Sequence, residues 1–304
     1  MVSLRARIVE LALPLLGLKR FFSEPERIDA RLAKARAAAT PRPRKKWHKR
    51  FQIMQDTSRG FPLVTLTPRG GARADAPHML YLHGGAYVLD IASLHWDAIA
   101  MMCERLGASA SVPLYPLAPE ASVATTLPAM RALYDELAAR EGASSIALAG
   151  DSAGGGMALA LAQDLAASDA AMPGSLLLFS PWLDGASSDP RMTAIDPLDR
   201  MLAPQGLAAC ATRYAGGLPI EDPRISPLLG PLTGLPPLAI FAGTRDILLI
   251  DARRLRDRLE ELGEPAALYV EAERMQHVWM LLPIPEGRAA LEQAAAFLQD
   301  CHAS

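Results

Sequence analysis

The sequence has few cysteines and lacks any apolar run long enough to cross a bilayer. Three cysteines, Cys103, Cys210 and Cys301, occur in 304 residues. An odd and widely spaced set argues against a disulfide framework and favours a reducing compartment. No apolar run approaches the roughly 20 residues that a transmembrane helix needs. We therefore expect a cytoplasmic protein.

A strong net charge is also lacking, because 31 basic residues face 33 acidic ones. This balance gives no global attraction to nucleic acid. The basic residues are concentrated at the start, where residues 1–50 hold 14 Lys/Arg and 4 Asp/Glu. Residues 42–50 read as an exposed basic connector without a recognisable nucleic-acid-binding module, so no nucleic-acid partner is expected. The sequence also shows no internal repeat and no metal-binding cluster, and we expect neither a metal nor a cofactor.

Apolar strand patterns alternate with helical patterns over most of the chain. Such alternation predicts an α/β fold, with a mostly parallel sheet that carries helices on both faces. Eight strands are expected, at residues 52–54, 63–67, 77–82, 110–114, 146–149, 174–180, 238–242 and 267–270. Helices are expected at residues 94–106, 127–140, 155–167, 204–214, 251–262 and 286–298. Residues 182–234 are irregular and rich in proline, which indicates an insertion.

The most informative stretch is Gly150-Asp151-Ser152-Ala153-Gly154, between an expected strand and an expected helix. This is a G-x-S-x-G motif in its required setting. Glycines on both sides permit a turn too sharp for other residues, and the turn lifts the Ser152 hydroxyl clear of the sheet. The alternative is a phosphate-binding helix start, but the Lys-Ser/Thr of a P-loop is missing. We therefore predict that Ser152 is a nucleophile.

A serine nucleophile needs a base and a group that orients the base. In α/β hydrolases the chain order is Ser, acid, His. Only His277 and His302 follow Ser152, and His302 lies too near the end. Asp246 follows the penultimate strand and is the predicted acid, whereas the nearby Asp251 is better placed as the N-cap of the next helix.

The sequence resembles the bacterial hormone-sensitive-lipase-like esterases, family IV of the bacterial lipolytic enzymes, on the α/β-hydrolase fold. The matching stretches, which run from about residue 80 to the C-terminus, are His83-Gly84-Gly85-Ala86-Tyr87, Tyr115-Pro116-Leu117-Ala118-Pro119-Glu120, Gly150-Asp151-Ser152-Ala153-Gly154-Gly155, Asp246 and His277. Ala86 stands where the family most often has a third glycine.

The resemblance implies a role for each matching residue. Ser152 would be the nucleophile, His277 the base and Asp246 the acid. The oxyanion-hole N–H groups would come from Gly84, Gly85 and Ala153. His83 would be structural, bonding within its own loop.

The resemblance also implies a helical cap and a homodimer through the last strand and helix. The cap would comprise residues 1–50 and an insertion at about 182–217, on a catalytic domain of residues 51–304. Its apolar residues would line an acyl or alcohol site or simply pack the cap. These residues are Leu13, Leu15, Leu16, Phe21, Phe22, Trp182, Leu183, Met201, Leu202 and Tyr214.

The N-terminal residues resemble a signal peptide only superficially. Arg5 and Arg7 precede the apolar residues 8–18, but Glu10 interrupts this run and no small-residue cleavage site is evident. We expect one amphipathic helix, which either packs over the active-site mouth or makes weak contact with an anionic membrane surface.

These features together predict a serine carboxylesterase. It would hydrolyse short- to medium-chain esters, with a small-molecule ester as substrate, through an acyl-enzyme intermediate on Ser152. Two alternatives stay open: a lactone hydrolase that uses the same residues, and a non-catalytic ligand-binding protein on the same fold.

Overall fold

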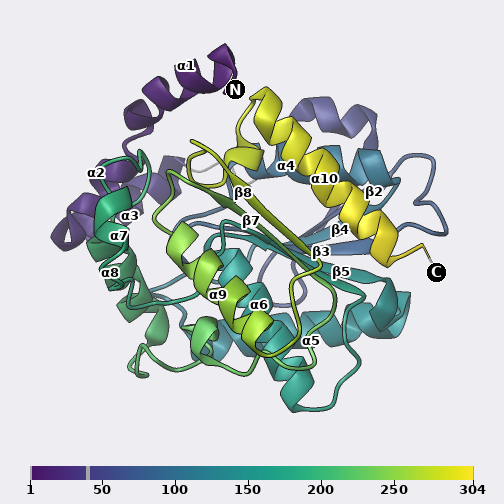
Figure 1. The fold of residues 1–304 in the computed structure, drawn as a ribbon. Helices are drawn as coiled ribbons and strands as arrows, with labels where there is room; N and C mark the ends of the chain where they lie inside the picture. Colours follow the sequence, from purple (N-terminus) through teal and green to yellow (C-terminus); the bar gives the residue numbers. More distant parts are fainter. Residues whose placement is uncertain (1, 39–41, 304) are drawn as a thin grey trace.

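An eight-stranded sheet runs through the protein in the order β1-β2-β4-β3-β5-β6-β7-β8 (Figure 1). The computed structural model describes residues 2–38 and 42–303. β1 and β2 pair antiparallel, as do β2 and β4, and every other pair is parallel. The strands are β1 (Phe51–Asp56), β2 (Leu63–Pro68), β3 (His78–Leu82), β4 (Ser109–Pro113), β5 (Ile146–Asp151), β6 (Ser175–Phe179), β7 (Leu238–Gly243) and β8 (Leu268–Ala272). The predicted eight-stranded, mostly parallel sheet is confirmed.

The central strands are buried on both faces. Every residue of β3, β4, β5, β6 and β7 is buried, whereas every residue of the edge strand β8 is half-buried. This is why the central strands read as apolar runs without a polar alternation. Figure 1 shows α4 (Ser93–Leu106) and α10 (Pro285–Cys301) together on one face of the sheet. α5 (Val123–Glu141), α6 (Ala153–Ala167) and α9 (Leu249–Glu261) lie on the other face.

The N-terminal segment, where an amphipathic helix was expected, contains several short helices. It forms α1 (Leu4–Ala12), a 3₁₀ turn η1 (Leu13–Leu16), α2 (Leu18–Ser23) and α3 (Ile28–Ala38). Pro14 lies at the start of η1, and Gly17 has a φ of 71°, a left-handed conformation that ends the turn. The expected helix is therefore present as α1, and these two residues end it before the apolar run does.

The segment between β6 and β7 lies beside the N-terminal helices. It carries α7 (Met192–Ile195) and α8 (Pro204–Ala215), and α8 packs directly on α2 (Figure 1). The approach is close, because a Cβ built on Gly206 would lie 2.1 Å from the carbonyl oxygen of Phe22. The two parts of the chain that were expected to form a cap thus contact each other.

The basic connector at residues 42–50 is more ordered than expected. It contains a 3₁₀ turn, η3 (Lys45–Lys49), in which Trp47 is buried and donates a 2.6 Å hydrogen bond to Asp97 of α4. The expectation of an exposed connector therefore holds for most of these residues and is wrong at Pro43 and Trp47. Of the described helices, none is both long and apolar enough to cross a membrane.

Candidate active site

Ser152 lies in a strained turn between β5 and α6. Its φ of 53° and ψ of −122° fall outside the regions that a non-glycine residue normally adopts. The surrounding backbone holds this conformation, because the Ser152 N–H donates to Phe179 (2.8 Å) and the Ser152 carbonyl accepts from Trp182 (2.9 Å). The strain places the side chain at the carboxyl end of β5, just before the first turn of α6.

The glycines of the motif are required by close backbone contacts. A Cβ built on Gly154 would lie 2.1 Å from the carbonyl oxygen of Leu82 in β3. A Cβ on Gly150 would lie 2.3 Å from the carbonyl oxygen of Gly154. Because backbone cannot move aside as a flexible side chain can, the turn packs against β3 only with glycine at these positions.

Gly154→Ala is expected to lower the free energy of unfolding by about 3 kcal/mol, because the added methyl group overlaps backbone. Gly70→Ala is the matched control, since a Cβ at Gly70 meets nothing within 4 Å. It should change stability by less than about 0.5 kcal/mol. Urea denaturation of both variants measures the difference, and equal stabilities would contradict the packing argument.

Asp246 and His277 lie side by side after β7 and β8. His277 Nδ1 and Asp246 Oδ2 are 2.8 Å apart, and both residues are buried. The other oxygen of Asp246 accepts from the Leu248 N–H at 2.9 Å. Ser152 follows β5 in the same parallel sheet, so all three predicted residues lie at the carboxyl edge of the strands.

The surroundings of His277 favour its protonated form. Burial alone would lower the pKa of His277, but the charge and hydrogen bond of Asp246 outweigh burial. Asp199 and Asp151 add smaller contributions, and the pKa of His277 is raised above 6.5. A base with a pKa near the working pH is well suited to accept a proton from a hydroxyl group and return it.

Asp199 belongs to this site, although the sequence placed it only within the insertion. Its Oδ2 accepts the Ile247 N–H at 3.0 Å, and its Oδ1 accepts those of Met201 and Leu202 at 2.8 Å. Burial and the neighbouring Asp246 raise the pKa of Asp199 to about 6. Asp199 thus ties the insertion to the residue that follows Asp246. The only sequence signal was an Asp-Pro-Leu-Asp stretch in an otherwise irregular region.

Asp251 is not the N-cap that the sequence suggested. It lies inside the first turn of α9, which begins at Leu249. Its Oδ2 accepts the N–H groups of Leu183 (2.9 Å) and Asp184 (3.0 Å), and burial raises its pKa to about 7. Asp251 therefore holds the loop after β6, whereas Asp246 is the carboxylate that contacts His277.

The glycine-rich loop after β3 is held by Asp151, the residue before Ser152. Asp151 is buried and accepts hydrogen bonds from the Gly84 N–H (3.0 Å) and the Tyr81 hydroxyl (2.9 Å), and its Oδ2 lies 3.2 Å from His95 Nε2. Burial would raise the pKa of Asp151, but His95, Tyr81 and Gly84 outweigh it and lower the pKa. Sequence reasoning missed the roles of Tyr81 and His95.

The bond from Gly84 to Asp151 differs from the expectation that the Gly84 N–H is free to face an oxyanion. Within residues 2–38 and 42–303, the N–H groups of Gly85 and Ala86 donate no hydrogen bond. Ala153 is the first residue of α6, so its N–H has no acceptor within the helix. Gly85, Ala86 and Ala153 thus present unpaired N–H groups near Ser152.

His83 is a buried structural residue in this structure. Its Nδ1 lies 2.7 Å from the Gly84 carbonyl oxygen, and its ring stacks on Tyr115 with ring centres 4.3 Å apart. Burial lowers the pKa of His83 to about 4, so the ring is neutral at pH 7. These contacts match the expected bonding of His83 within its own loop.

Glu10 of α1 reaches the two residues that precede Asp246 and His277. Its carboxylate pairs with Arg245 and accepts from the Gln276 amide at 3.2 Å. Gln276 also donates to the Leu198 carbonyl (3.0 Å) and accepts from the Arg200 N–H (2.8 Å). The N-terminal helix and the insertion therefore meet at the loops that carry Asp246 and His277. From the sequence alone, Glu10 was noted only as the residue that interrupts the apolar run, and its contacts with Arg245 and Gln276 were not predicted.

The apolar residues that were expected to line the site fall into two groups. Leu15 and Leu16 are exposed. The expectation is wrong for Leu15, which lies on the surface, whereas Leu16 lines the cavity of about 810 Å³ between α2 and α3. The other eight are buried, and Tyr214 stacks on Tyr87 with ring centres 3.8 Å apart. That stacking joins α8 to the loop after β3.

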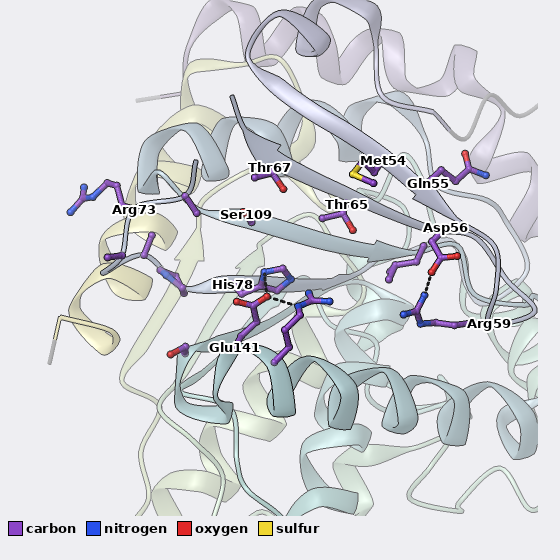
Figure 2. A pocket seen from close by; sticks show the side chains of 17 residues that line it. Met54, Gln55, Asp56, Arg59, Thr65, Thr67, Arg73, His78, Ser109 and Glu141 are labelled. Atoms are coloured by element: carbon purple, nitrogen blue, oxygen red, sulfur yellow. Dashed lines mark hydrogen bonds and ion pairs between the residues drawn. The ribbon is translucent and has the colours of Figure 1, made fainter. Parts of the chain in front are cut away.

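Two cavities lie in different parts of the molecule. One of about 810 Å³ lies between α2 and α3 and reaches Leu89, whose N–H donates to the Gly85 carbonyl. The other, of about 620 Å³, lies at the opposite edge of the sheet, where β3 and β4 begin (Figure 2). Its charged groups are largely paired, as Arg59 is with Asp56 and Glu136. It contains no residue of the predicted site.

A metal site is not formed by the residues that the structure describes, among which no three His, Cys, Asp or Glu side chains are grouped to hold an ion.

Comparison with known proteins places this arrangement in a family. Residues 79–281 match a family described by the alpha/beta hydrolase fold. An acetyl-hydrolase of Streptomyces hygroscopicus is 35% identical over 234 residues, which cover 75% of this chain and 77% of that protein. A triacylglycerol lipase of Mycobacterium tuberculosis is 33% identical over 231 residues. The match covers 76% of this chain but spans about half, 47%, of that lipase.

A solved structure extends the likeness to the whole fold. It is an esterase from the bacterial hormone-sensitive lipase family, 30% identical, with a TM-score of 0.78. The superposition covers 92% of this chain and 98% of that chain.

Proposed function

Because the chain belongs to the hormone-sensitive-lipase-like family of α/β hydrolases, we propose that it is a serine carboxylesterase acting on short- to medium-chain esters. The observation that carries this proposal is the buried 2.8 Å contact between His277 Nδ1 and Asp246 Oδ2, at the sheet edge where the strained Ser152 turn also lies. The names of the relatives, an acetyl-hydrolase and a triacylglycerol lipase, describe ester hydrolysis by those proteins.

We propose a reaction in two steps that uses these residues. Ser152 Oγ attacks the ester carbonyl while His277 Nε2 accepts its proton, and Asp246 stabilises the imidazolium through Nδ1. Collapse of the tetrahedral intermediate breaks the bond to the alcohol, which leaves with the proton from His277. Water then attacks the acyl-Ser152 ester with His277 as base, and this step releases the acid and restores the serine.

We assign oxyanion stabilisation to the N–H groups of Gly85, Ala153 and Ala86. Ala86 replaces Gly84 in this proposal, because the Gly84 N–H is held by Asp151 at 3.0 Å. Ala86 has a φ of 53°, so the alanine adopts the left-handed conformation that a glycine would adopt easily. Each such donor is worth about 3–4 kcal/mol in the transition state.

We propose that the cavity between α2 and α3 receives the acyl chain, and that the N-terminal segment and the insertion together form the cap. Leu89 lines this cavity, and its N–H donates to the carbonyl oxygen of Gly85 in the proposed oxyanion loop. Turnover of p-nitrophenyl esters from two to sixteen carbons should therefore peak at short to medium chains. Ala35→Trp, which fills the cavity, should move the peak to shorter chains. An unchanged profile would contradict the cavity assignment, and lactones in the same assay test the alternative substrate class.

The pH dependence of kcat/KM should report the pKa of His277. Protonated His277 cannot accept the Ser152 proton, so kcat/KM falls as the pH drops through its pKa. Because that pKa is raised, half-maximal kcat/KM is expected above pH 6.5. Asp199→Asn removes a negative charge near His277 and should move the acidic limb to lower pH. If the acidic limb of the Asp199→Asn profile lies at the same pH as that of the natural chain, the electrostatic role of Asp199 is contradicted.

We also propose a cytoplasmic location, which the free cysteines support. Cys103 and Cys210 are buried and unpaired, and Cys301 is half-buried and unpaired.

A further inference from the structure

One face of α1 and η1 exposes a continuous set of large apolar side chains. Five of the nine exposed large hydrophobic residues in the described chain lie between residues 4 and 16. They are Leu4 (74% exposed), Ile8 (58%), Leu11 (78%), Leu15 (87%) and Leu16 (60%). Leu4, Ile8 and Leu11 are spaced as i, i+4 and i+7, which places them on one side of the helix. Single exposed leucines are common, but such a cluster marks an interaction surface.

The opposite face of α1 is bound to the protein. Ala6 and Leu13 are buried, Glu10 pairs with Arg245, and the Ser3 hydroxyl donates to Glu286 at 2.9 Å. Figure 1 shows α1 at the edge of the molecule, with its N-terminal end near the start of α10. The helix is therefore held in place by one face while the apolar face points to solvent.

The charge around the apolar face has one sign. Arg5 and Arg7 are exposed beside it. Glu10 is the one acidic residue in residues 1–23, and it faces Arg245 in the body. An apolar stripe flanked by cations fits a lipid surface, in which anionic headgroups lie above apolar acyl chains.

We propose that α1 and η1 dock on an anionic lipid surface. The helix would lie in the plane of the interface, with Leu4, Ile8, Leu11 and Leu15 among the acyl chains and Arg5 and Arg7 at the headgroups. Because the buried face of α1 contacts the residues before Asp246 and His277, docking turns the carboxyl edge of the sheet toward the lipid. The proposal does not depend on the catalytic assignment.

Cosedimentation of the full chain with vesicles tests the proposal. The vesicles contain ether-linked phosphatidylcholine with or without ether-linked phosphatidylglycerol, so that they carry no ester to hydrolyse. We expect binding to the anionic vesicles that weakens with added salt. Arg5→Gln with Arg7→Gln should weaken binding about 30-fold, since each basic residue contributes about 1 kcal/mol near an anionic surface.

A four-residue variant, Leu4→Gln, Ile8→Gln, Leu11→Gln and Leu15→Gln, should lose vesicle binding. Its matched control is Met54→Gln with Leu229→Gln and Leu262→Gln, which removes exposed apolar side chains elsewhere. The control should bind as the natural chain does, and circular dichroism confirms that both variants are folded. Failure of the natural chain to bind anionic vesicles overturns the proposal, as does equal binding by the four-residue variant. The natural chain could instead bind no vesicles and form a dimer without lipid. If the four-residue variant loses that dimer and the control variant keeps it, the apolar face binds a second copy of the chain.

Discussion

Ser152→Ala should reduce kcat for p-nitrophenyl ester hydrolysis by about a millionfold, the scale seen when the nucleophile of a serine triad is removed. Alanine has no oxygen to form the acyl-enzyme and no hydroxyl proton for His277 to accept. A residual rate over water of about 10³–10⁴-fold should persist, because the backbone donors and the binding site remain.

A covalent label separates this prediction from a loss of folding. An organophosphate should add its mass to the natural chain and leave Ser152→Ala unmodified, while thermal unfolding shows that the variant is still folded. Hydrolysis at the natural rate by folded Ser152→Ala would remove the esterase mechanism. A chain that binds esters without turning them over, despite intact Ser152, would favour the ligand-binding alternative.

Asp246→Asn should lower kcat by about 10⁴-fold. The asparagine side chain can bind His277 Nδ1 only in the wrong tautomer or without a negative charge, so the imidazolium that forms during the reaction loses its partner. The buried geometry at 2.8 Å leaves no water to substitute for the carboxylate. The loss should appear in kcat more than in KM, because the charge acts on the transition state.

Asp251→Asn is the matched control for Asp246→Asn. Asp251 is an equally buried carboxylate five residues further on, and its contacts are the Leu183 and Asp184 N–H groups. An asparagine oxygen can accept both hydrogen bonds, so kcat should stay within about tenfold of the natural value. A loss in Asp251→Asn as large as that in Asp246→Asn would contradict the assignment of Asp246 as the acid.

The parts that the sequence predicted correctly depend on local patterns. Each buried central strand is an apolar run that ends in a turn signal, so strands such as β5 and β7 were placed within one or two residues of their observed bounds. The family and the fold class are confirmed by the match over residues 79–281. Ser152 could be singled out because its turn needs glycine on both sides.

The features of the site that sequence reasoning missed depend on contacts between segments far apart in the chain. Glu10 and Gln276 are 266 positions apart, and Asp199 and Ile247 are 48 apart. A buried carboxylate in an irregular loop has no periodicity, so Asp199 was not distinguished from a surface residue. The resemblance to the family implied that the Gly84 N–H donates to the substrate. The sequence does not show that Asp151, at the end of another strand, accepts this N–H instead.

The contacts of Asp199 also bear on how freely caps can be exchanged between enzymes of this fold. Asp199 lies in the insertion between β6 and β7, yet its carboxylate accepts the N–H of Ile247, the residue after Asp246. A chimaera in which this insertion is replaced by that of another enzyme loses the hydrogen bond from Ile247, even if the chimaera folds. We expect such exchanges to retain activity only when the donor sequence brings a carboxylate to the same place. If the proposed cap sets the substrate range, we expect that range and the support of Asp246 to be inherited together.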